Sequence, residues 1–495
     1  MRTGPGWSHR FPAISPICVA VALLIFICLK VQGGNEAVLA TSPAVPLTKK
    51  VDANLLSFWN GRLVIDVEER TRVEVANNTR DFNSAVRDVN DDAWLANRFR
   101  FGVAFKPISW LKLYGQTQDS REAYSKRPNI PGVRGAEGDD TFDLRQGYVA
   151  LGDTKRYPLL LTVGRQAITY GDGRLVADSR WGNFGRTFDA IRLRFEEPRY
   201  WVEGFAMRPV QIERHVFDTS DPKDNFFGGY FSTTLVPQQT TDLYVFYRRK
   251  DGNQSTLDPT NTINPQGTWN GPAARFVTLG ARIKSKPDSL HGWDYNVELA
   301  YENGDVYASN LKSARSDLSA LALNVAGGYT AERLLWKPRV GLEYDYASGD
   351  SSATDQNSES FQNLFPSNHD KYGIMDEFSW RNLHDLRLQV NAKPCKNLEL
   401  EFDFHAFWLA DTHDYWYRSN GISILRTKTP DGQDVRTIGA RNRAGEELDL
   451  IATYELNRNI KVQVGYTHFF AGPYLADTGA SSDADFGYVM TTFIY

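Results

Sequence analysis

Arginines stand at alternate positions in one extended segment of this sequence. Arg98 and Arg100 alternate with Phe99 and Phe101, so the arginines share one face of an extended chain and the rings share the other. The guanidinium group keeps its charge and grips carboxylates through two parallel hydrogen bonds. A ring of such groups in a narrow, water-filled pore would lower the barrier to anions. The same alternation predicts inward-facing basic side chains at Arg62, Arg98, Arg100, Lys106, Arg145, Arg192, Arg194, Arg282, Lys284, Arg339 and Arg387.

Carboxylates occupy the corresponding face of later segments. We therefore expect a lumen with a basic sector and an acidic sector. Two interpretations stay open for each residue: it contacts a passing anion, or it pairs across the lumen and braces a wide barrel. For the early arginines as a group, transport is the favoured interpretation. The acidic side chains with inward parity are Asp294, Glu298, Glu302, Glu343, Asp345, Glu399, Glu401, Asp403 and Asp449.

Other chemistries have little support in the sequence. Spacing across a loop is not diagnostic of a metal site, so no metal ligands are predicted, although one run has a suitable composition. The glycine-rich segment 170–174 lacks the Gly-Lys-Thr ending and the following helix of a phosphate loop, and we expect it to fold back into the lumen. No local pattern places a serine near a histidine for nucleophilic catalysis. We predict no enzyme activity and no cofactor. The run with metal-like composition is His405, Asp411, His413 and Asp414.

Alternation of apolar with polar or small residues recurs over about ten positions at a time after residue 58. This pattern is typical of strands with one face in lipid and the other in water. From Leu398 to Trp408, for example, apolar and charged residues alternate. A soluble sandwich would alternate in the same way, so the pattern alone does not decide. Strands are expected at about 61–72, 93–106, 108–118, 141–152, 158–166, 186–196, 199–207, 227–236, 240–249, 272–285, 291–304, 318–330, 336–347, 383–393, 397–410, 444–455, 459–470 and 485–495.

Loop lengths distinguish the two folds. Connections alternate between tight turns, such as 196–199 and 457–459, and long segments, such as 348–382 and 411–443. Outer-membrane barrels have this asymmetry, with short periplasmic turns and long extracellular loops, and closure leaves no exposed edge strand. The sequence therefore predicts an all-β fold: a transmembrane antiparallel β-barrel of about 18 strands.

Aromatic residues make up 13% of the chain, which favours strands and membrane interfaces. The chain ends in aromatic Tyr495, with Phe493 two residues before it, a typical insertion signal that implies the barrel-assembly machinery and outer-membrane lipid as partners. We interpret the aromatics near strand ends as an interfacial girdle and not as sugar-stacking groups. This girdle set is Trp94, Trp110, Trp201, Tyr244, Trp293 and Trp408.

Composition excludes two other classes. A mean hydropathy of −0.44 excludes a multi-helix membrane protein. A net charge of −4 without a basic run argues against a nucleic-acid partner. The apolar run from Ile14 to Leu29, preceded by Arg2 and Arg10, predicts a signal peptide over 1–40. A membrane anchor is the alternative, but the run is shorter than the roughly 20 apolar residues of a span.

Two groups of motifs are more specific. The first is LRQGYV at 144–149, VGRQ at 163–166, YGDGRLV at 170–176, WGN at 181–183 and GRTFDAIRL at 185–193. The second is NLFPSNH at 363–369, WRNLHDL at 380–386 and FWLA at 407–410. Together they resemble the alginate-export family of outer-membrane proteins over about residues 58–495.

The resemblance implies a monomeric barrel of 18 strands with an arginine-lined conduit for an anionic polysaccharide. Arg145 and Arg165 match conduit arginines of the family, as does either Arg98 or Arg100. Gln146 stands where family members often carry Glu, so the resemblance implies that Arg145 lacks an acidic partner at this position. Arg165 shares its parity with Leu161 and Val163, which requires a bulge or the upper strand end if it is to point inward.

We expect three parts: a signal peptide at 1–40, a periplasmic lead-in at 41–57 and a barrel at 58–495. The barrel would pass an anionic polysaccharide or related carbohydrate across the outer membrane of a Gram-negative-type bacterium, in either direction. The first alternative is a general or substrate-specific porin for small solutes. The second is an enzyme or adhesin whose chemistry lies in residues 411–443.

Overall fold

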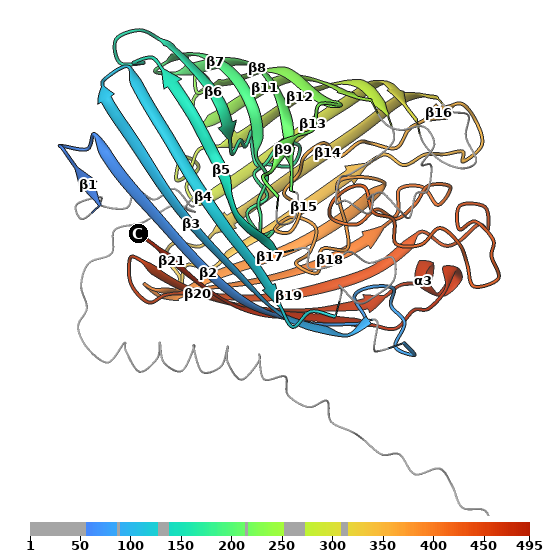
Figure 1. Cartoon of the computed structure of the whole chain (residues 1–495). Coiled ribbons are helices and arrows are strands. Elements are labelled where there is room, and N and C mark those ends of the chain that lie inside the picture. Colours follow the sequence, from blue (N-terminus) through green and yellow to red (C-terminus); the bar gives the residue numbers. More distant parts are fainter. Residues whose placement is uncertain (1–55, 87–89, 127–137, 213–215, 252–272, 308–314) are drawn as a thin grey trace, which may run out of the picture.

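The dominant feature of the computed structural model is one closed antiparallel sheet of 18 long strands, within the described residues 56–86, 90–126, 138–212, 216–251, 273–307 and 315–495 (Figure 1). The predicted strand number and antiparallel order are confirmed. The barrel strands are β2 (Leu63–Asn77), β3 (Asp92–Ile108), β4 (Leu111–Ala123), β5 (Asp140–Leu151), β6 (Leu159–Gln166), β7 (Phe188–Glu197), β8 (Tyr200–Gln211), β10 (Asp224–Thr233), β11 (Gln239–Lys250), β12 (Ala274–Ser285), β13 (Trp293–Val306), β14 (Ser316–Thr330), β15 (Arg339–Ala347), β17 (Leu383–Cys395), β18 (Leu398–Trp408), β19 (Arg443–Glu455), β20 (Ile460–Ala471) and β21 (Ala484–Ile494).

The last strand closes the barrel on the first. Strand β21 pairs antiparallel with β2 from Glu68 opposite Ile494 to Asn77 opposite Asp485. Beyond the strand, Tyr495 exchanges two backbone hydrogen bonds with Val67, at 2.9 and 3.0 Å. Closure satisfies the backbone groups that an open sheet edge would leave bare in lipid.

Each strand separates an apolar outer face from a polar inner face. On β3, Phe99 is 38% exposed, whereas its neighbour Arg98 is 4% exposed. The phenylalanine therefore points to the outside of the barrel, where lipid would cover it, and the arginine points to the lumen. Among the residues that the structure describes, no helix has the length and apolar character needed to cross a membrane.

Connections at the two ends of the barrel differ in length. Strands β3 and β4 are joined by residues 109–110 and strands β7 and β8 by 198–199, whereas 348–382 join β15 to β17 and 409–442 join β18 to β19. In outer-membrane barrels the short turns are periplasmic and the long connections extracellular. The small elements of the fold are β1 (Ser57–Phe58), β9 (Thr219–Ser220), β16 (Asn357–Ser358) and α3 (Pro473–Thr478).

Two long connections pair with each other through their backbones. We call 167–187 the first inner segment and 348–382 the second inner segment. Val176 forms a parallel bridge with Phe365. The Phe365 amide donates to Leu175 O at 2.7 Å, and the Ala177 amide donates to Phe365 O at 2.8 Å. All four residues are buried, so both segments contribute to the core of the barrel.

The predicted aromatic girdle is wrong at three positions. Tyr244 is buried and donates to Glu298 Oε1 at 2.9 Å, and Trp94 Nε1 donates to Glu74 Oε1 at 2.9 Å. Trp201 stacks on the buried Tyr230 with 5.3 Å between ring centroids. Strand parity turns these rings toward polar partners in the lumen. Trp110 and Trp293 are exposed, as an interfacial position requires.

The predicted signal peptide at 1–40 lies outside the described residues, as do residues 41–55 of the predicted lead-in. The end of that lead-in contributes β1, which pairs with β2 through Ser57 opposite Val64 and Phe58 opposite Leu63.

Candidate functional site

Five arginines gather on the lumen wall at β2, β3 and β5. Strand register places Arg70 directly opposite Arg98. Like charges in such cross-strand positions repel each other, so this arrangement costs stability unless other groups offset it. We call this set the basic cluster. Its members, all buried, are Arg70, Arg72, Arg98, Arg100 and Arg145.

Carboxylates offset only part of this charge. Glu68 pairs with Arg98 and lies 3.5 Å from Arg100. Glu74 pairs with Arg72 at 2.8 Å, and Asp178 lies 4.0 Å from Arg145. In the described part of the chain, five guanidinium groups therefore face three carboxylates.

Backbone carbonyls of the first inner segment satisfy much of the remaining guanidinium hydrogen bonding. Arg70 Nη1 donates to Arg180 O at 2.8 Å, and Arg98 Nη1 donates to Gly182 O at 3.0 Å. Arg100 Nη2 donates to Phe184 O at 3.3 Å. Neutral carbonyl oxygens thus occupy positions where a carboxylate would bind with greater strength.

Trp181 and Asn183 anchor this part of the first inner segment. The guanidinium of Arg72 lies 3.6 Å from the centroid of the Trp181 ring and donates to Trp181 O at 2.8 Å. The Asn183 side-chain amide donates to Asn97 O at 2.9 Å and to Gly138 O at 2.8 Å. These contacts hold residues 180–184 against the wall.

Acidic residues dominate another arc of the wall, on β15, β17, β18 and β19, and only β20 and β21 separate this arc from β2. Arg387 on β17 is the main cation from the wall itself: it lies 2.5 Å from Asp403, 3.3 Å from Glu401 and 3.5 Å from Glu343. We call this set the acidic cluster. Its members are Glu343, Asp345, Asp385, Glu401, Asp403, Glu447 and Asp449.

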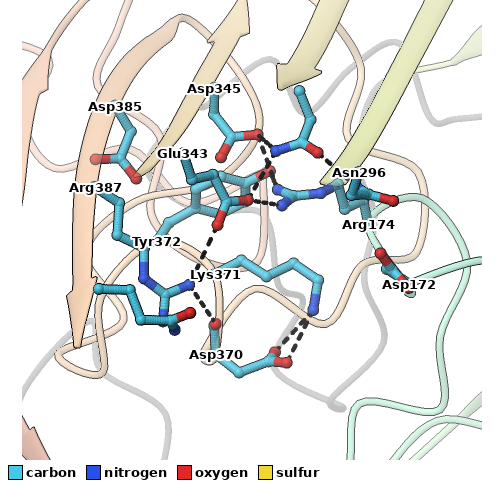
Figure 2. A network of polar contacts seen from close by, with 12 residues as sticks. Asp172, Arg174, Asn296, Glu343, Asp345, Asp370, Lys371, Tyr372, Asp385 and Arg387 are labelled. Carbon is cyan, nitrogen blue, oxygen red and sulfur yellow. Dashed lines mark hydrogen bonds and ion pairs between the residues drawn. The ribbon is translucent and has the colours of Figure 1, made fainter. Parts of the chain in front are cut away.

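Arg174 carries a second cation into the acidic cluster from the first inner segment (Figure 2). It donates to Asp345 at 2.9 Å, pairs with Glu343 and donates to the Tyr372 hydroxyl at 2.8 Å. Burial disfavours the charged guanidinium of Arg174. The nearby Asp345, Tyr372 and Glu343 outweigh this effect and raise the pKa of Arg174 well above its usual value. Arg174 therefore joins both inner segments to β15.

The second inner segment reaches Arg387 from the lumen side (Figure 2). Arg387 Nη1 donates to Asp370 O at 3.3 Å, and Lys371 pairs with the Asp370 side chain at 3.0 Å. The backbone of this segment thus completes the coordination of a wall arginine, as the first inner segment does in the basic cluster.

The other predicted conduit arginines on the lumen face each pair with a wall carboxylate. Arg192 and Arg194 share Glu203, each at 2.9 Å. A separate pair is Arg339 with Asp294, at 2.6 Å. These pairs fit the bracing interpretation and leave a role in transport open.

Arg282 also contacts the first inner segment. It lies 2.7 Å from Asp242 on the wall and 2.8 Å from Asp172. Burial opposes ionisation of Asp172, but the nearby charges of Arg282 and Lys284 lower the pKa of Asp172 to about 2. The expected return of segment 170–174 to the lumen is confirmed by these contacts.

Arg165 lies apart from the basic cluster. It continues the outward alternation of Val163 on β6, pairs with Asp189 at 2.9 Å and donates to Asp218 O at 3.0 Å. The Phe217 ring lies 5.6 Å from its guanidinium. The structure therefore does not bring Arg165 together with Arg98, Arg100 or Arg145, because no bulge reverses its parity.

Sequence reasoning missed Arg70, Arg72 and Arg174. Arg70 and Arg72 share the parity of Arg62, so the alternation that predicts an inward Arg62 also identifies them when it is extended along β2. Arg174 gave no such signal, because its partners lie on β15, far along the chain.

Two groups of side chains among the described residues could hold a metal ion. Asp140, Asp143 and Asp218 form one group, and Asp403, His405 and Asp449 form the other. The run noted in the sequence does not assemble around His405: His413 pairs with Asp411 at 2.8 Å in an exposed position.

A closed 18-stranded barrel with an apolar exterior and a charged lumen defines the class of outer-membrane channels. Solved structures support this fold. The chain resembles Pseudomonas aeruginosa OpdK, crystallised with vanillate, at 11% identity over 87% of this chain and 98% of that one, with a TM-score of 0.52. It resembles Acinetobacter baumannii OccAB1 at 9% identity over 90% and 98% of the two chains, with a TM-score of 0.54.

The sequence itself identifies the family. The alginate export family matches residues 62–489, nearly the whole barrel, and the chain belongs to that family. A comparison with curated proteins gave no match. The chain is a channel of the Gram-negative outer membrane and not an enzyme, as the sequence predicted.

Proposed function

We propose that this channel passes an anionic carbohydrate polymer, with the basic cluster as the main contact for its carboxylates. One observation carries the proposal: five buried arginines face three carboxylates, and backbone carbonyls of the first inner segment supply much of the remaining hydrogen bonding. If that segment leaves the lumen, the arginines gain a surplus of positive charge and open donor positions. Uronate groups would then replace the carbonyls in stronger, charge-assisted bonds.

The repulsion between Arg70 and Arg98 supports a functional role. A barrel braced only for stability would match each guanidinium with a carboxylate, as Arg339 and Asp294 are matched at 2.6 Å. The basic cluster instead keeps opposed like charges on adjacent strands. Family membership supports the same substrate class. Arg165, by its outward parity, lies beside this path. The other predicted conduit arginines that face the lumen stay candidates for it, namely Arg192, Arg194, Arg282, Arg339 and Arg387.

Planar-bilayer recordings test this function. We expect oligouronates to block the current of the open channel, with a block that strengthens as the chain lengthens, because longer chains meet several arginines at once. Replacing Arg98, Arg100 and Arg145 with Gln should abolish the block and reduce anion selectivity. The matched control replaces three exposed arginines, Arg249, Arg275 and Arg441, with Gln. Unchanged selectivity in the first triple variant would refute the proposal.

A second candidate is a channel for small carboxylates. The two inner segments occupy the lumen and pair with each other, which favours small solutes while they stay in place. OpdK was crystallised with vanillate, a small aromatic carboxylate, and has the same fold. Block by monomeric uronate or vanillate that equals block by long oligouronates would favour this candidate.

We also propose that the barrel acts as a monomer inserted by the barrel-assembly machinery. The aromatic strand β21, which closes the ring on β2, supports this proposal.

A further inference from the structure

Three potential metal ligands face the lumen on adjacent strands of the acidic cluster. Asp403 and His405 alternate on β18, and strand register places Asp449 of β19 directly opposite Asp403. Each side chain is at most 2% exposed. One ligand atom from each of the three lies within 4.8 Å of the other two. Donors on one zinc ion lie at most about 4.4 Å apart, since Zn–N and Zn–O bonds are about 2.0 to 2.2 Å, so a small inward shift of the side chains would bring all three onto a common ion.

Asp385 fixes the orientation of the His405 ring. His405 Nδ1 lies 2.9 and 3.1 Å from the two carboxylate oxygens of Asp385. An ionised carboxylate only accepts hydrogen bonds, so Nδ1 is the donor and Nε2 is the atom free to bind a metal. Nε2 lies 4.0 Å from Asp449 Oδ2, beyond hydrogen-bond distance. A carboxylate behind a histidine is the usual outer partner of a metal-bound imidazole.

Asp403 and Asp449 each have one buried carboxylate oxygen that no protein donor in the described part of the chain reaches. Asp403 Oδ2 accepts from Arg387 at 2.5 Å, and Asp449 Oδ2 accepts from the Ile374 amide at 3.3 Å. Among the described residues, neither Asp403 Oδ1 nor Asp449 Oδ1 has a hydrogen-bond partner, and both are buried. Burying such oxygens without a partner is costly. Glu447, opposite His405, also has one unpaired buried oxygen.

We propose that Asp403, His405 and Asp449 bind one divalent transition-metal ion of the zinc type. An imidazole nitrogen beside two carboxylates suits zinc, whereas calcium and magnesium prefer oxygen ligands alone. Such an ion would coordinate the buried oxygens of Asp403 and Asp449 that no donor from the described residues reaches. This proposal is independent of the transported substrate.

The ion would also retain the second inner segment in the lumen. The Ile374 amide donates to Asp449 at 3.3 Å, and the Met375 amide donates to Glu447 Oε1 at 2.9 Å. A metal bound to Asp449 would hold this carboxylate in place, and the carboxylate accepts the hydrogen bond from the Ile374 amide of the second inner segment. Removal of the metal should therefore loosen residues 373–375 and raise the sensitivity of the second inner segment to protease.

Metal analysis of the folded full chain in detergent tests the proposal. The protein is stripped with EDTA, incubated with Zn²⁺, desalted and analysed by mass spectrometry for zinc. We expect one tightly held Zn²⁺ per chain in the wild type, little in His405→Asn and Asp449→Asn, and wild-type retention in the control His468→Asn. His468 pairs with Asp485 at 2.8 Å and lies outside the acidic cluster. No retained zinc in the wild type, or equal retention in all variants, overturns the proposal.

A second measurement separates a metal ligand from a charged histidine held between two aspartates. Asp385→Asn should weaken zinc binding by roughly 10- to 100-fold without abolishing it, as expected for an outer partner. Co²⁺ added to the stripped wild type should give a visible d–d absorption band that Zn²⁺ removes. A charged histidine without a metal predicts no such band, so its absence from the folded wild type refutes the site even where variants fail to fold.

Discussion

Arg174 on the first inner segment donates to Asp345 on β15 at 2.9 Å, although 171 residues separate them in the chain. The same guanidinium pairs with Glu343 and contacts Tyr372 of the second inner segment. One side chain therefore links both inner segments to the barrel wall, and its loss should affect the conductance more than the integrity of the sheet.

Replacing Arg174 with Met should release the inner segments. The change leaves Glu343 and Asp345 buried without their shared cation, and breaking a buried pair typically costs about 3 to 5 kcal/mol. The lost contacts join the inner segments to the wall and do not hold the strands together. We therefore expect the barrel to stay folded, the inner segments to loosen and the mean single-channel conductance to rise. Arg249→Met is the control, since Arg249 is exposed and exposed pairs contribute little. Equal conductance in the two variants would contradict this prediction.

Replacing Gly185 with Ala should weaken the hold of the basic cluster on the first inner segment. Gly185 has a φ of +73°, and an added Cβ would lie 3.1 Å from Arg100 Nη2 and 3.2 Å from Arg145 Nη2. The backbone strain alone costs about 1 to 2 kcal/mol. Gly182→Ala is the control, because its nearest heavy atom is Ser179 O at 3.6 Å. Bilayer recordings should show more frequent opening for Gly185→Ala only.

The stability of the packed connections should fall as the pH rises from about 4.5 to about 7. Burial raises the pKa of Glu377 from 4.5 to about 7, although the adjacent Arg418, at 2.6 Å, favours the ionised form. The folded chain therefore holds this proton more tightly than the unfolded chain, and deprotonation across that window costs up to about 3 kcal/mol. Glu377→Gln should flatten the dependence in denaturant titrations at pH 5, 6 and 8.

Glu359→Gln provides the control for this pH series. Glu359 lies on the same connection and accepts from Ser351 at 3.2 Å in an exposed position, so its replacement should leave the pH dependence as in the wild type. If the free energy of unfolding of Glu377→Gln still falls with pH as in the wild type, groups other than Glu377 cause the effect.

Deleting residues 493–495 should reduce the amount of assembled barrel several-fold. The deletion removes the pairing of Phe493 with Glu69 and both hydrogen bonds between Tyr495 and Val67. Because these contacts close the ring, their loss exposes the edge of β2. Heat-modifiability gels of outer-membrane fractions measure this directly. Thr492→Ala, which keeps the backbone ladder, should assemble normally.

The barrel was predictable from sequence because its signal is local. A strand with one face in lipid and the other in water must alternate apolar and polar residues, and this pattern is visible in any short stretch of sequence. The expected strand 93–106 accordingly lies within β3 (Asp92–Ile108), and the expected strand 383–393 lies within β17 (Leu383–Cys395). The same alternation correctly turned Arg98 and Arg100 toward the lumen.

The content of the lumen was harder to predict because its contacts join distant segments. Nothing in the local sequence around Val176 indicates a backbone bridge to Phe365, and nothing around Arg174 indicates Asp345. The assignment of Trp201 to the aromatic girdle is wrong because it rests only on the position of Trp201 near a strand end. Such a position fits both the membrane interface and the mouth of the lumen, and strand parity is needed to distinguish the two.

The bridge between Val176 and Phe365 has a mechanical consequence. Three peptide hydrogen bonds, at 2.7, 2.8 and 3.0 Å, join the first inner segment to the second, so a force that withdraws either segment must pull the other along or break all three bonds. The passage would then switch in a single cooperative step, and current traces would show one large jump without intermediate levels.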